Sequence, residues 1–328
     1  MPRRPILLLT LALFAGCTSP EPTATEPVTS ASTSTTLPAT TTTTAIATTS
    51  TTTPGPPVAW LTTSGVPVAV TGVEGDMIEV LTPCGYAALV DEGTPIYEVE
   101  VVIDPGHGGP IDTGAVASTG LQEKRVNLEV GLAVHSELEE RGIASMLTRN
   151  ADYPVPIRTR TGYADLVGAR ALVSIHHNAP AAPASEIPGI EIFVQQGSSE
   201  SQRLGGLLYD ATMAALGAFD VDWDRAPDAG VMTVLNSDGR DAYGMVRRPK
   251  AASALVELGY IANRAEAELY ATDEYAPAAA EAIADAIEEF LRTDNSGAPL
   301  VEGRNFDPQS GVGQDQCIEP ELGATVEG

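Results

Sequence analysis

Two histidines and two glutamates stand at the ends of predicted elements, where side chains are free to do chemistry. His107 follows an apolar run in a glycine-rich turn, which lets the backbone bend sharply and keeps the imidazole exposed. Glu123 lies at the start of the next predicted helix, and His176 ends the apolar stretch ALVSIH. Two imidazoles and one carboxylate, with a fourth position left for water, are the ligand set of a catalytic zinc site. The sequence therefore predicts that these three residues hold one zinc ion per chain.

The fourth residue, Glu257, lies in the apolar segment ALVELGY near a predicted strand end. A carboxylate in an apolar strand is costly to bury unless it has a partner. A water at the metal would be such a partner, and Glu257 would accept its proton. Asn127 follows Glu123 by one helical turn and could hydrogen-bond that carboxylate, while Asp104 and Asn178 are candidates for orienting the loops around the metal.

Strand-like and helix-like segments alternate from about residue 98 to residue 292. Such alternation indicates an α/β fold, with a twisted, mostly parallel sheet covered by helices on both faces. The predicted strands are EVEVVID, ASMLTR, ARALVSIH, IEIFVQ and ASALVELGY. The predicted helices are EKRVNLEVGLAVHSELEERG, SESQRLGGLLYDATMAAL and AEAIADAIEEFLR.

Four motifs in this region, IDPGHGG, QEKRVNL, SIHHNA and LVELGYIAN, resemble in order and separation those of zinc-dependent N-acetylmuramoyl-L-alanine amidases of the amidase-3 type. The resemblance covers about residues 101 to 291. It implies that His107, Glu123 and His176 bind zinc and that Glu257 is catalytic. It also implies hydrolysis of the amide bond between N-acetylmuramic acid and L-alanine in peptidoglycan, for cell-wall remodelling or cell separation.

Two adjacent histidines compete for the third ligand position. Strand alternation sends the side chains of His176 and His177 in opposite directions, so only one of them can face the metal. The spacing of the family motifs selects His176. His177 is then expected to be a cleft or surface residue.

Two other functions fit the same residues. A non-catalytic or autoinhibited wall-binding regulator is one, although such a protein would be expected to have lost a ligand or Glu257. A zinc peptidase that cuts a different wall bond is the other. The stretch Phe219 to Arg248 matches the family loosely, and we interpret it either as a cleft rim or as a lid that a protein activator would move.

The N-terminus has the layout of a bacterial export signal, with two arginines, an apolar stretch and the ending Ala15-Gly16-Cys17. This ending resembles a lipobox, which implies cleavage before Cys17 and attachment of a lipid to its sulfur; an ordinary signal peptide is the alternative. Residues 18–57 are rich in threonine, serine and proline and are predicted to be a disordered tether. We therefore expect an extracytoplasmic protein that is anchored to the membrane and faces the cell wall.

Short strand-like runs in residues 58–97 predict a small β element of three or four strands. We expect it to pack on or beside the catalytic domain, residues 98–292; a separate wall-binding module is the alternative. Lipidation of Cys17 would leave Cys84 and Cys317 as a pair in an oxidising compartment. We predict a disulfide between them that ties down the C-terminal tail, residues 293–328, with two free thiols as the alternative.

The chain is strongly acidic, with 44 acidic against 18 basic residues and a formal net charge of -26. This charge argues against nucleic acid as the main partner. Because the acidic residues are interspersed along the chain, most of them are expected to form a solvated surface. Peptidoglycan remains the expected substrate, and a monomer is the expected state.

Overall fold

The computed structural model describes residues 55–179, 184–308, 313–323 and 325–326. The predicted export signal with Cys17 and nearly all of the predicted tether lie outside these residues. Within the described part, no helix has both the length and the apolar character needed to cross a membrane.

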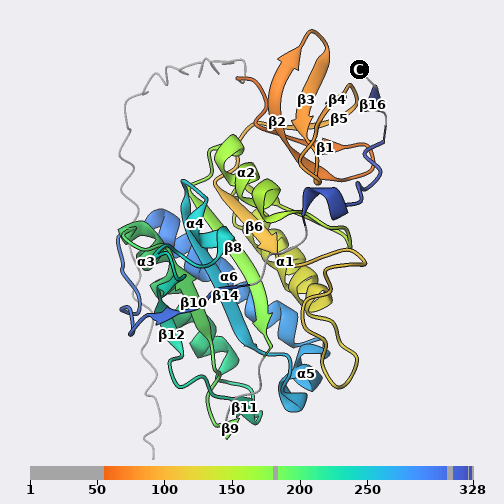
Figure 1. Cartoon of the computed structure of the whole chain (residues 1–328). Helices are drawn as coiled ribbons and strands as arrows, with labels where there is room; N and C mark the ends of the chain where they lie inside the picture. The colour runs from red at the N-terminus through yellow and green to blue at the C-terminus, as the bar shows by residue number, and fades with distance from the viewer. Residues whose placement is uncertain (1–54, 180–183, 309–312, 324, 327–328) are drawn as a thin grey trace, which may run out of the picture. The chain divides into compact units, whose positions relative to one another are not determined.

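A six-stranded sheet forms the centre of the fold, in the order β12-β10-β14-β8-β6-β7 (Figure 1). Neighbouring strands are parallel except for β10 and β14, which are antiparallel. The predicted mostly parallel sheet is therefore confirmed. Its strands are β6 (Val101–Pro105), β7 (Ser145–Leu147), β8 (Ala171–Asn178), β10 (Glu191–Val194), β12 (Gly230–Met232) and β14 (Ala252–Tyr260).

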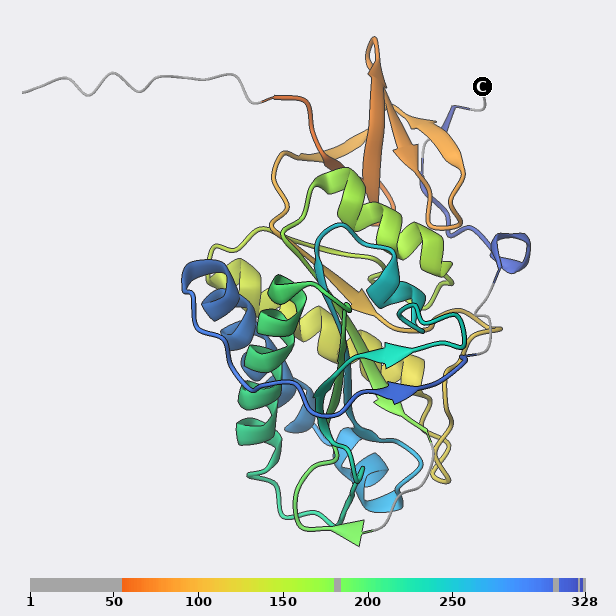
Figure 2. The same ribbon diagram turned by 60° about the vertical axis from the view of Figure 1, so that its left-hand side comes forward.

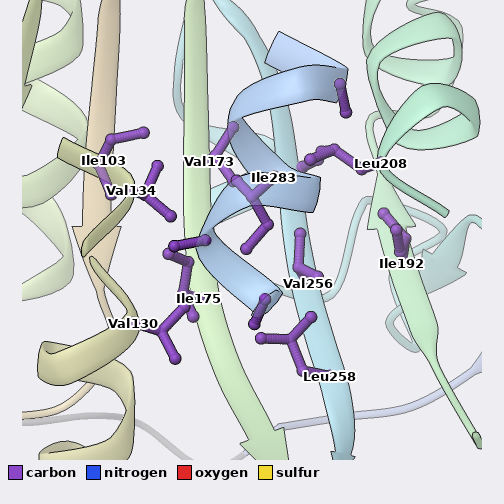
Figure 3. Close-up of a cluster of buried hydrophobic side chains, with 14 of the residues drawn as sticks. Ile103, Val130, Val134, Val173, Ile175, Ile192, Leu208, Val256, Leu258 and Ile283 are labelled. Atoms are coloured by element: carbon purple, nitrogen blue, oxygen red, sulfur yellow. The ribbon is translucent and has the colours of Figure 1, made fainter. Parts of the chain in front are cut away.

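Helices cover both faces of this sheet, as predicted. On one face, α1, α3 and α6 bury a continuous apolar cluster against the strands, and Figure 3 shows Val134, Leu208 and Ile283 of these helices beside it. Each such side chain contributes about 1.5–3 kcal/mol by its removal from water. The opposite face is covered by α2 and α4. The helices are α1 (Glu123–Glu140), α2 (Ile157–Val167), α3 (Ser199–Leu216), α4 (Gly244–Arg247), α5 (Arg264–Tyr270) and α6 (Tyr275–Arg292).

Strand alternation decides which residues face the cleft. In β8, Val173 and Ile175 belong to the cluster under α1, α3 and α6, so His176 points to the α2 and α4 side. In β14, Val256 belongs to the same cluster, so Glu257 also points to the α2 and α4 side. His176 and Glu257 are Cα partners in the β8–β14 register, and they therefore lie side by side on one face.

A second six-stranded sheet, in the order β16-β4-β3-β2-β1-β5, lies beside α2 (Figure 2). Tyr163 of α2 donates a hydrogen bond to the carbonyl oxygen of Leu81, 3.0 Å away. Residues 58–97 contain five strands instead of the expected three or four, because the stretch around Pro95 pairs with β1 as an edge strand, where a missing N–H is tolerated. The strands are β1 (Ala59–Thr62), β2 (Pro67–Glu74), β3 (Met77–Leu81), β4 (Ala87–Val90), β5 (Gly93–Ile96) and β16 (Thr325–Val326).

The C-terminal tail contacts the central sheet, where Leu300 forms a parallel bridge with Val231 of β12, and it pairs with the second sheet through β16. Its strand β15 (Arg304–Asn305) pairs in parallel with β13 (Val234–Leu235), and β16 pairs with β4 of the second sheet. Between them, a short 3-10 helix (Gln314–Gln316) precedes the disulfide that the sequence predicted. Cys84 and Cys317 are joined, with their Cα atoms 5.5 Å apart.

The stretch Phe219 to Arg248 is built into the fold. It supplies β12, β13 and α4, and it also forms β11 (Trp223–Asp224), which pairs with β9 (Ala184–Ser185). The side chains of Trp223 and Val231 are fully buried. Removing this stretch would therefore expose the core, and its residues near α4 form a wall of the cleft.

Removing the disulfide is expected to destabilise the protein. The two cysteines are 233 residues apart, and for such a separation the chain-entropy model gives a stabilisation of about 5 kcal/mol. We expect the Cys84→Ala/Cys317→Ala variant to unfold about 5–10 °C below the wild type in a thermal scan. As a control, a reductant should lower the wild-type midpoint to that of the variant and leave the variant unchanged. Equal midpoints without reductant would contradict the prediction.

Candidate metal centre

The turn after β6 presents His107 and is held by two buried arginines. His107 has a φ of 61°, a left-handed conformation that is strained for a residue with a side chain. Arg149 Nη2 donates to the carbonyl oxygen of Gly106 at 2.9 Å, and Arg160 Nη2 donates to that of His107 at 2.6 Å. These guanidinium contacts keep the turn in place despite its strain.

Three candidate ligands converge beside this turn. One donor atom each from His107, Glu123 and His176 lie within 4.8 Å of one another. Glu123 Oε1 is 3.1 Å from His107 Nε2 and 3.0 Å from His176 Nδ1. The two imidazole rings meet edge to face, with their centroids 4.9 Å apart. The structure thus brings together the three residues that the sequence singled out. They come from two strand ends and one helix start.

Two glycines leave the space that this arrangement needs. A Cβ at Gly106 would lie 2.2 Å from the ring of His176, and a Cβ at Gly114 would lie 2.5 Å from Glu123 Oε2. Gly114 also has a φ of 63°. Both positions therefore exclude a side chain. Two nitrogens and a carboxylate oxygen at this spacing fit a zinc ion with an open coordination position.

The Glu123 carboxylate is almost fully buried and is saturated with donors. Its Oε2 accepts a hydrogen bond from the Ala115 backbone N–H at 2.8 Å. Its Oε1 accepts from Asn127 Nδ2 at 3.3 Å and from the backbone N–H of His177 at 3.2 Å. Asn127 thus makes the contact that the helical spacing predicted. Burial alone would raise the pKa of Glu123, but its hydrogen bonds with His107 and His176 lower it well below its usual range.

His177 is among the residues that line the cleft, as one expectation had it, but it is fully buried, so the alternative of a surface residue is wrong. Its side chain is fully buried on the face covered by α1, α3 and α6, with Nδ1 2.7 Å from Asn127 Oδ1 and Nε2 2.7 Å from the Tyr275 hydroxyl. Burial lowers the pKa of His177 to about 3, so the ring is neutral. We assign the proton to Nδ1, which donates to Asn127, while Nε2 accepts from Tyr275. This chain of hydrogen bonds orients Asn127 toward Glu123.

Asp104 acts on the site through Arg160 and does not contact the three candidate ligands. It is fully buried and accepts hydrogen bonds from Arg160 Nη1 at 2.7 Å, Ser174 Oγ at 2.6 Å and Thr148 Oγ1 at 2.5 Å. Burial would raise the pKa of Asp104, but the charge of Arg160 and the hydroxyl donors lower it. Asp104 therefore fixes the guanidinium that holds the carbonyl oxygen of His107.

Glu257 lies next to the candidate ligands and lines the cleft. Its residue surface is partly exposed, whereas its Oε2 is buried and has no hydrogen-bond partner among the described residues. Burial, followed by the charges of Glu123 and Glu191, holds the pKa of Glu257 well above its usual range. A carboxyl group with a raised pKa in a cleft is suited to accept and release protons.

A second buried glutamate, Glu191, is the Cα partner of Glu257 on β10. Its Oε2 accepts hydrogen bonds from Asn178 Nδ2 at 2.5 Å and from the Tyr260 hydroxyl at 3.2 Å. Its Oε1 lies 2.5 Å from Arg304 Nη1 of the tail. The two groups form an ion pair, but their angles do not meet those of a hydrogen bond. Asn178 thus contacts Glu191 and none of the three candidate ligands. The sequence analysis missed Glu191, although it breaks the apolar run IEIFVQ as Glu257 breaks its own.

These residues open onto a cleft of about 1140 Å³, which also includes residues of the second sheet and the tail. On one wall, Tyr243 stacks on Phe193 with ring centroids 4.9 Å apart. Phe306 of the tail lies 5.9 Å from Tyr243 and is 48% exposed. The cleft therefore combines polar donors around the candidate ligands with an aromatic wall to which the tail contributes.

The fold and the site together define an α/β protein with a cleft that could hold a divalent metal beside a proton-accepting carboxylate. A family model described as N-acetylmuramoyl-L-alanine amidase, Amidase_3, matches residues 101–289, more than half of the chain. The protein belongs to this family.

Similar proteins include the uncharacterized protein YqiI of Bacillus subtilis, 32% identical over 64% of this chain and 91% of that protein. N-acetylmuramoyl-L-alanine amidase AmiC of Neisseria meningitidis is 27% identical over 59% of this chain, which spans about half (53%) of that protein. The solved structure of N-acetylmuramoyl-L-alanine amidase AmiC2 of Nostoc punctiforme has a TM-score of 0.50 and 32% identity, and covers 59% of this chain and 97% of its own.

Replacing Asn127 should weaken metal binding. Asn127→Leu keeps the branching of the side chain but removes the hydrogen bond to Glu123 and leaves the ring Nδ1–H of His177 unpaired. Loss of a partner that orients a ligand typically costs about 10- to 100-fold in metal affinity. Zinc affinity measured by competition with a chromophoric chelator should fall by that factor. The exposed Asn295→Leu variant serves as the control, and equal affinities in both variants would refute the role of Asn127.

Zinc affinity should rise with pH. Burial would lower the pKa of His107, but the hydrogen bonds to Asp112 and Glu123 outweigh it and raise this pKa to about 10 in the metal-free protein. His107 is therefore protonated near neutral pH, and a metal must displace that proton. Apparent affinity is expected to increase by up to about tenfold per pH unit between pH 6 and 8. Asp112→Asn should flatten this slope, whereas a wild-type affinity that is the same at both limits would contradict the assignment.

Proposed function

We propose that this protein hydrolyses the amide bond between N-acetylmuramic acid and L-alanine in peptidoglycan, with one zinc ion held by His107, Glu123 and His176. The observation that carries the proposal is the convergence of these three donors beside Glu257, in a chain that belongs to the amidase family. Glu257 Oε2 is buried and has no partner among the described residues, so a proton-carrying group is available next to the ligands.

Each residue has a distinct part in the proposed reaction. A bound zinc ion supplies Lewis-acid activation of water and of the scissile carbonyl group. Glu257 accepts the proton of the attacking water and passes it to the departing amine of L-alanine. Its raised pKa favours holding that proton between the two steps. Glu123 and Asn127 keep the two imidazoles in position, so the imidazoles do not reorganise during the reaction.

The proposed setting is the outer side of a bacterial cell membrane. Cys17 would carry a lipid, residues 18–57 would form a tether, and residues 98–292 would be the catalytic domain facing the wall. The substrate is peptidoglycan, and the proposed role is wall remodelling or cell separation by a monomer. A protein activator would act at the cleft wall to which the stretch Phe219 to Arg248 contributes.

The proposal is tested by digestion of purified peptidoglycan with the zinc-loaded protein, followed by mass spectrometry of the soluble products. The wild type should release stem peptides with a new L-alanine amino terminus. Glu257→Gln should keep its zinc and lose activity by about 10²- to 10⁴-fold, the usual contribution of a proton-transferring group. His176→Ala should lose both zinc and activity.

His135→Gln is the matched control for the histidine variant, because His135 lies on α1, half-buried, and contacts Ser145 instead of the candidate ligands. It should retain zinc and activity. Cleavage at a different bond would favour the zinc peptidase, and an intact wall in every digest would favour the regulatory protein.

A further inference from the structure

Two arginines in the cleft lack an anionic partner. Arg158, the second residue of α2, and Arg248, directly after α4, are exposed and line the cleft. Neither guanidinium forms an ion pair or a hydrogen bond with any residue that the structure describes. By contrast, Arg141 on the far side of the sheet pairs with Asp285 at 2.6 Å. In a chain with 44 acidic and 18 basic residues, two unpaired arginines in one cleft call for an explanation.

The packing of α2 on α4 brings these arginines together. A Cβ at Gly244 would lie 2.8 Å from Ile157 Cγ2 and 3.4 Å from Arg248 Nε, so Arg248 lies against the first turn of α2. Burial, followed by the charges of Arg158 and Arg247, lowers the pKa of Arg248. Arg247 is occupied, because it donates to the carbonyl oxygens of Ala242 and Asp241. Arg158 and Arg248 thus repel each other with nothing on the described chain to offset the repulsion.

The helix end adds to the positive potential. The first turn of α2 has no side-chain cap, and the N-terminus of a helix carries a partial positive charge. An anion held there would relieve the repulsion between the guanidiniums and accept hydrogen bonds from both. Guanidinium groups match carboxylates in shape and bind them with charge-assisted hydrogen bonds.

We propose that Arg158 and Arg248 form a binding subsite for a free carboxylate of the substrate's stem peptide. This inference rests on the proposed function, because a ligand that reaches the arginines shares the cleft with the candidate metal ligands. The acidic second residue of a stem peptide carries such a carboxylate when it is not amidated. The subsite would then distinguish free from amidated stems.

The acidic chain argues for this small anion over a large one. A formal net charge of -26 repels nucleic acids and anionic membrane surfaces as a whole. A single carboxylate inside the cleft needs only the local field of two guanidiniums, since charges farther away than about 10 Å are largely screened at ordinary ionic strength.

Two soluble ligands that differ at one group test the subsite. N-acetylmuramoyl-L-alanyl-D-glutamic acid γ-methylamide has a free α-carboxylate on its second residue, and N-acetylmuramoyl-L-alanyl-D-isoglutamine γ-methylamide has an amide there. The γ-methylamide of both stands in for the peptide bond to the third residue, so no other free carboxylate is present. Binding of both is measured by calorimetry on the zinc-loaded full chain carrying Glu257→Gln, which stops turnover. KM and kcat for both are measured on the chain with Glu257 intact.

We expect the free carboxylate to bind about tenfold more tightly than the amide, as one charge-assisted contact in a partly solvated cleft allows. Arg158→Gln and Arg248→Gln should each reduce this preference, and the double variant should bring it close to one. The change should appear in KM, with kcat altered less than about twofold. Lysine at either position should preserve part of the preference, and added salt should weaken it.

Arg264→Gln is the matched control, because this exposed arginine on α5 does not line the cleft and should leave the preference unchanged. A wild type that hydrolyses both ligands without preference, or a double variant that keeps the preference, overturns the subsite while the amidase function stands. A wild type that cleaves neither ligand but binds the carboxylate form more tightly, in an arginine-dependent way, sinks the proposed function and supports the subsite. Failure to bind either ligand overturns the subsite.

Discussion

The burial of the Glu123 carboxylate is the constraint on which the centre depends. A buried carboxylate is tolerated only when its oxygens are hydrogen-bonded, and those of Glu123 accept from the backbone of Ala115 and His177 and from Asn127. Its Oε1 also lies close to the imidazoles of His107 and His176. One side chain therefore fixes the glycine-rich loop, the start of α1 and the end of β8 relative to one another, so the spacing of the candidate ligands follows from the fold.

The second constraint is the register of the central sheet. His176, Glu257 and Glu191 are successive Cα partners across β8, β14 and β10, so their side chains stand in a row on one face. Glu257 and Glu191 are neighbours in this row, and two ionised carboxylates shielded from water would repel each other. Arg304 pairs with Glu191 and leaves Glu257 as the carboxyl group without a hydrogen bond at Oε2. Because Arg304 belongs to the tail, beyond residues 101–289, this part of the site lies outside the family match.

The sequence was sufficient to predict those parts of the site whose geometry a local pattern determines. The candidate ligands stand at element ends, and helical spacing alone placed Asn127 against Glu123. Prediction from the sequence failed for residues whose contacts are with distant or polar residues. His177 joins the core through Tyr275, which is 98 residues away, and no local pattern shows that a polar imidazole will be buried there. Helix α2 was not predicted because it buries polar residues such as Thr159 and Arg160, which weakens its apolar periodicity. The pairing of Arg304 with Glu191 likewise depends on how the tail folds back.

The overall charge of the protein and the charge of its cleft need not have the same effect on a substrate. Peptidoglycan stems carry carboxylates, and a chain with a formal net charge of -26 would repel them at long range. Salt screens that repulsion within about 10 Å, so the groups inside the cleft decide what happens at contact. There Glu123 and Glu191 are buried and paired, whereas Arg158 and Arg248 are exposed. Burying the acids next to the candidate metal site would therefore let a strongly acidic protein present the two arginines of the proposed subsite to an anionic polymer.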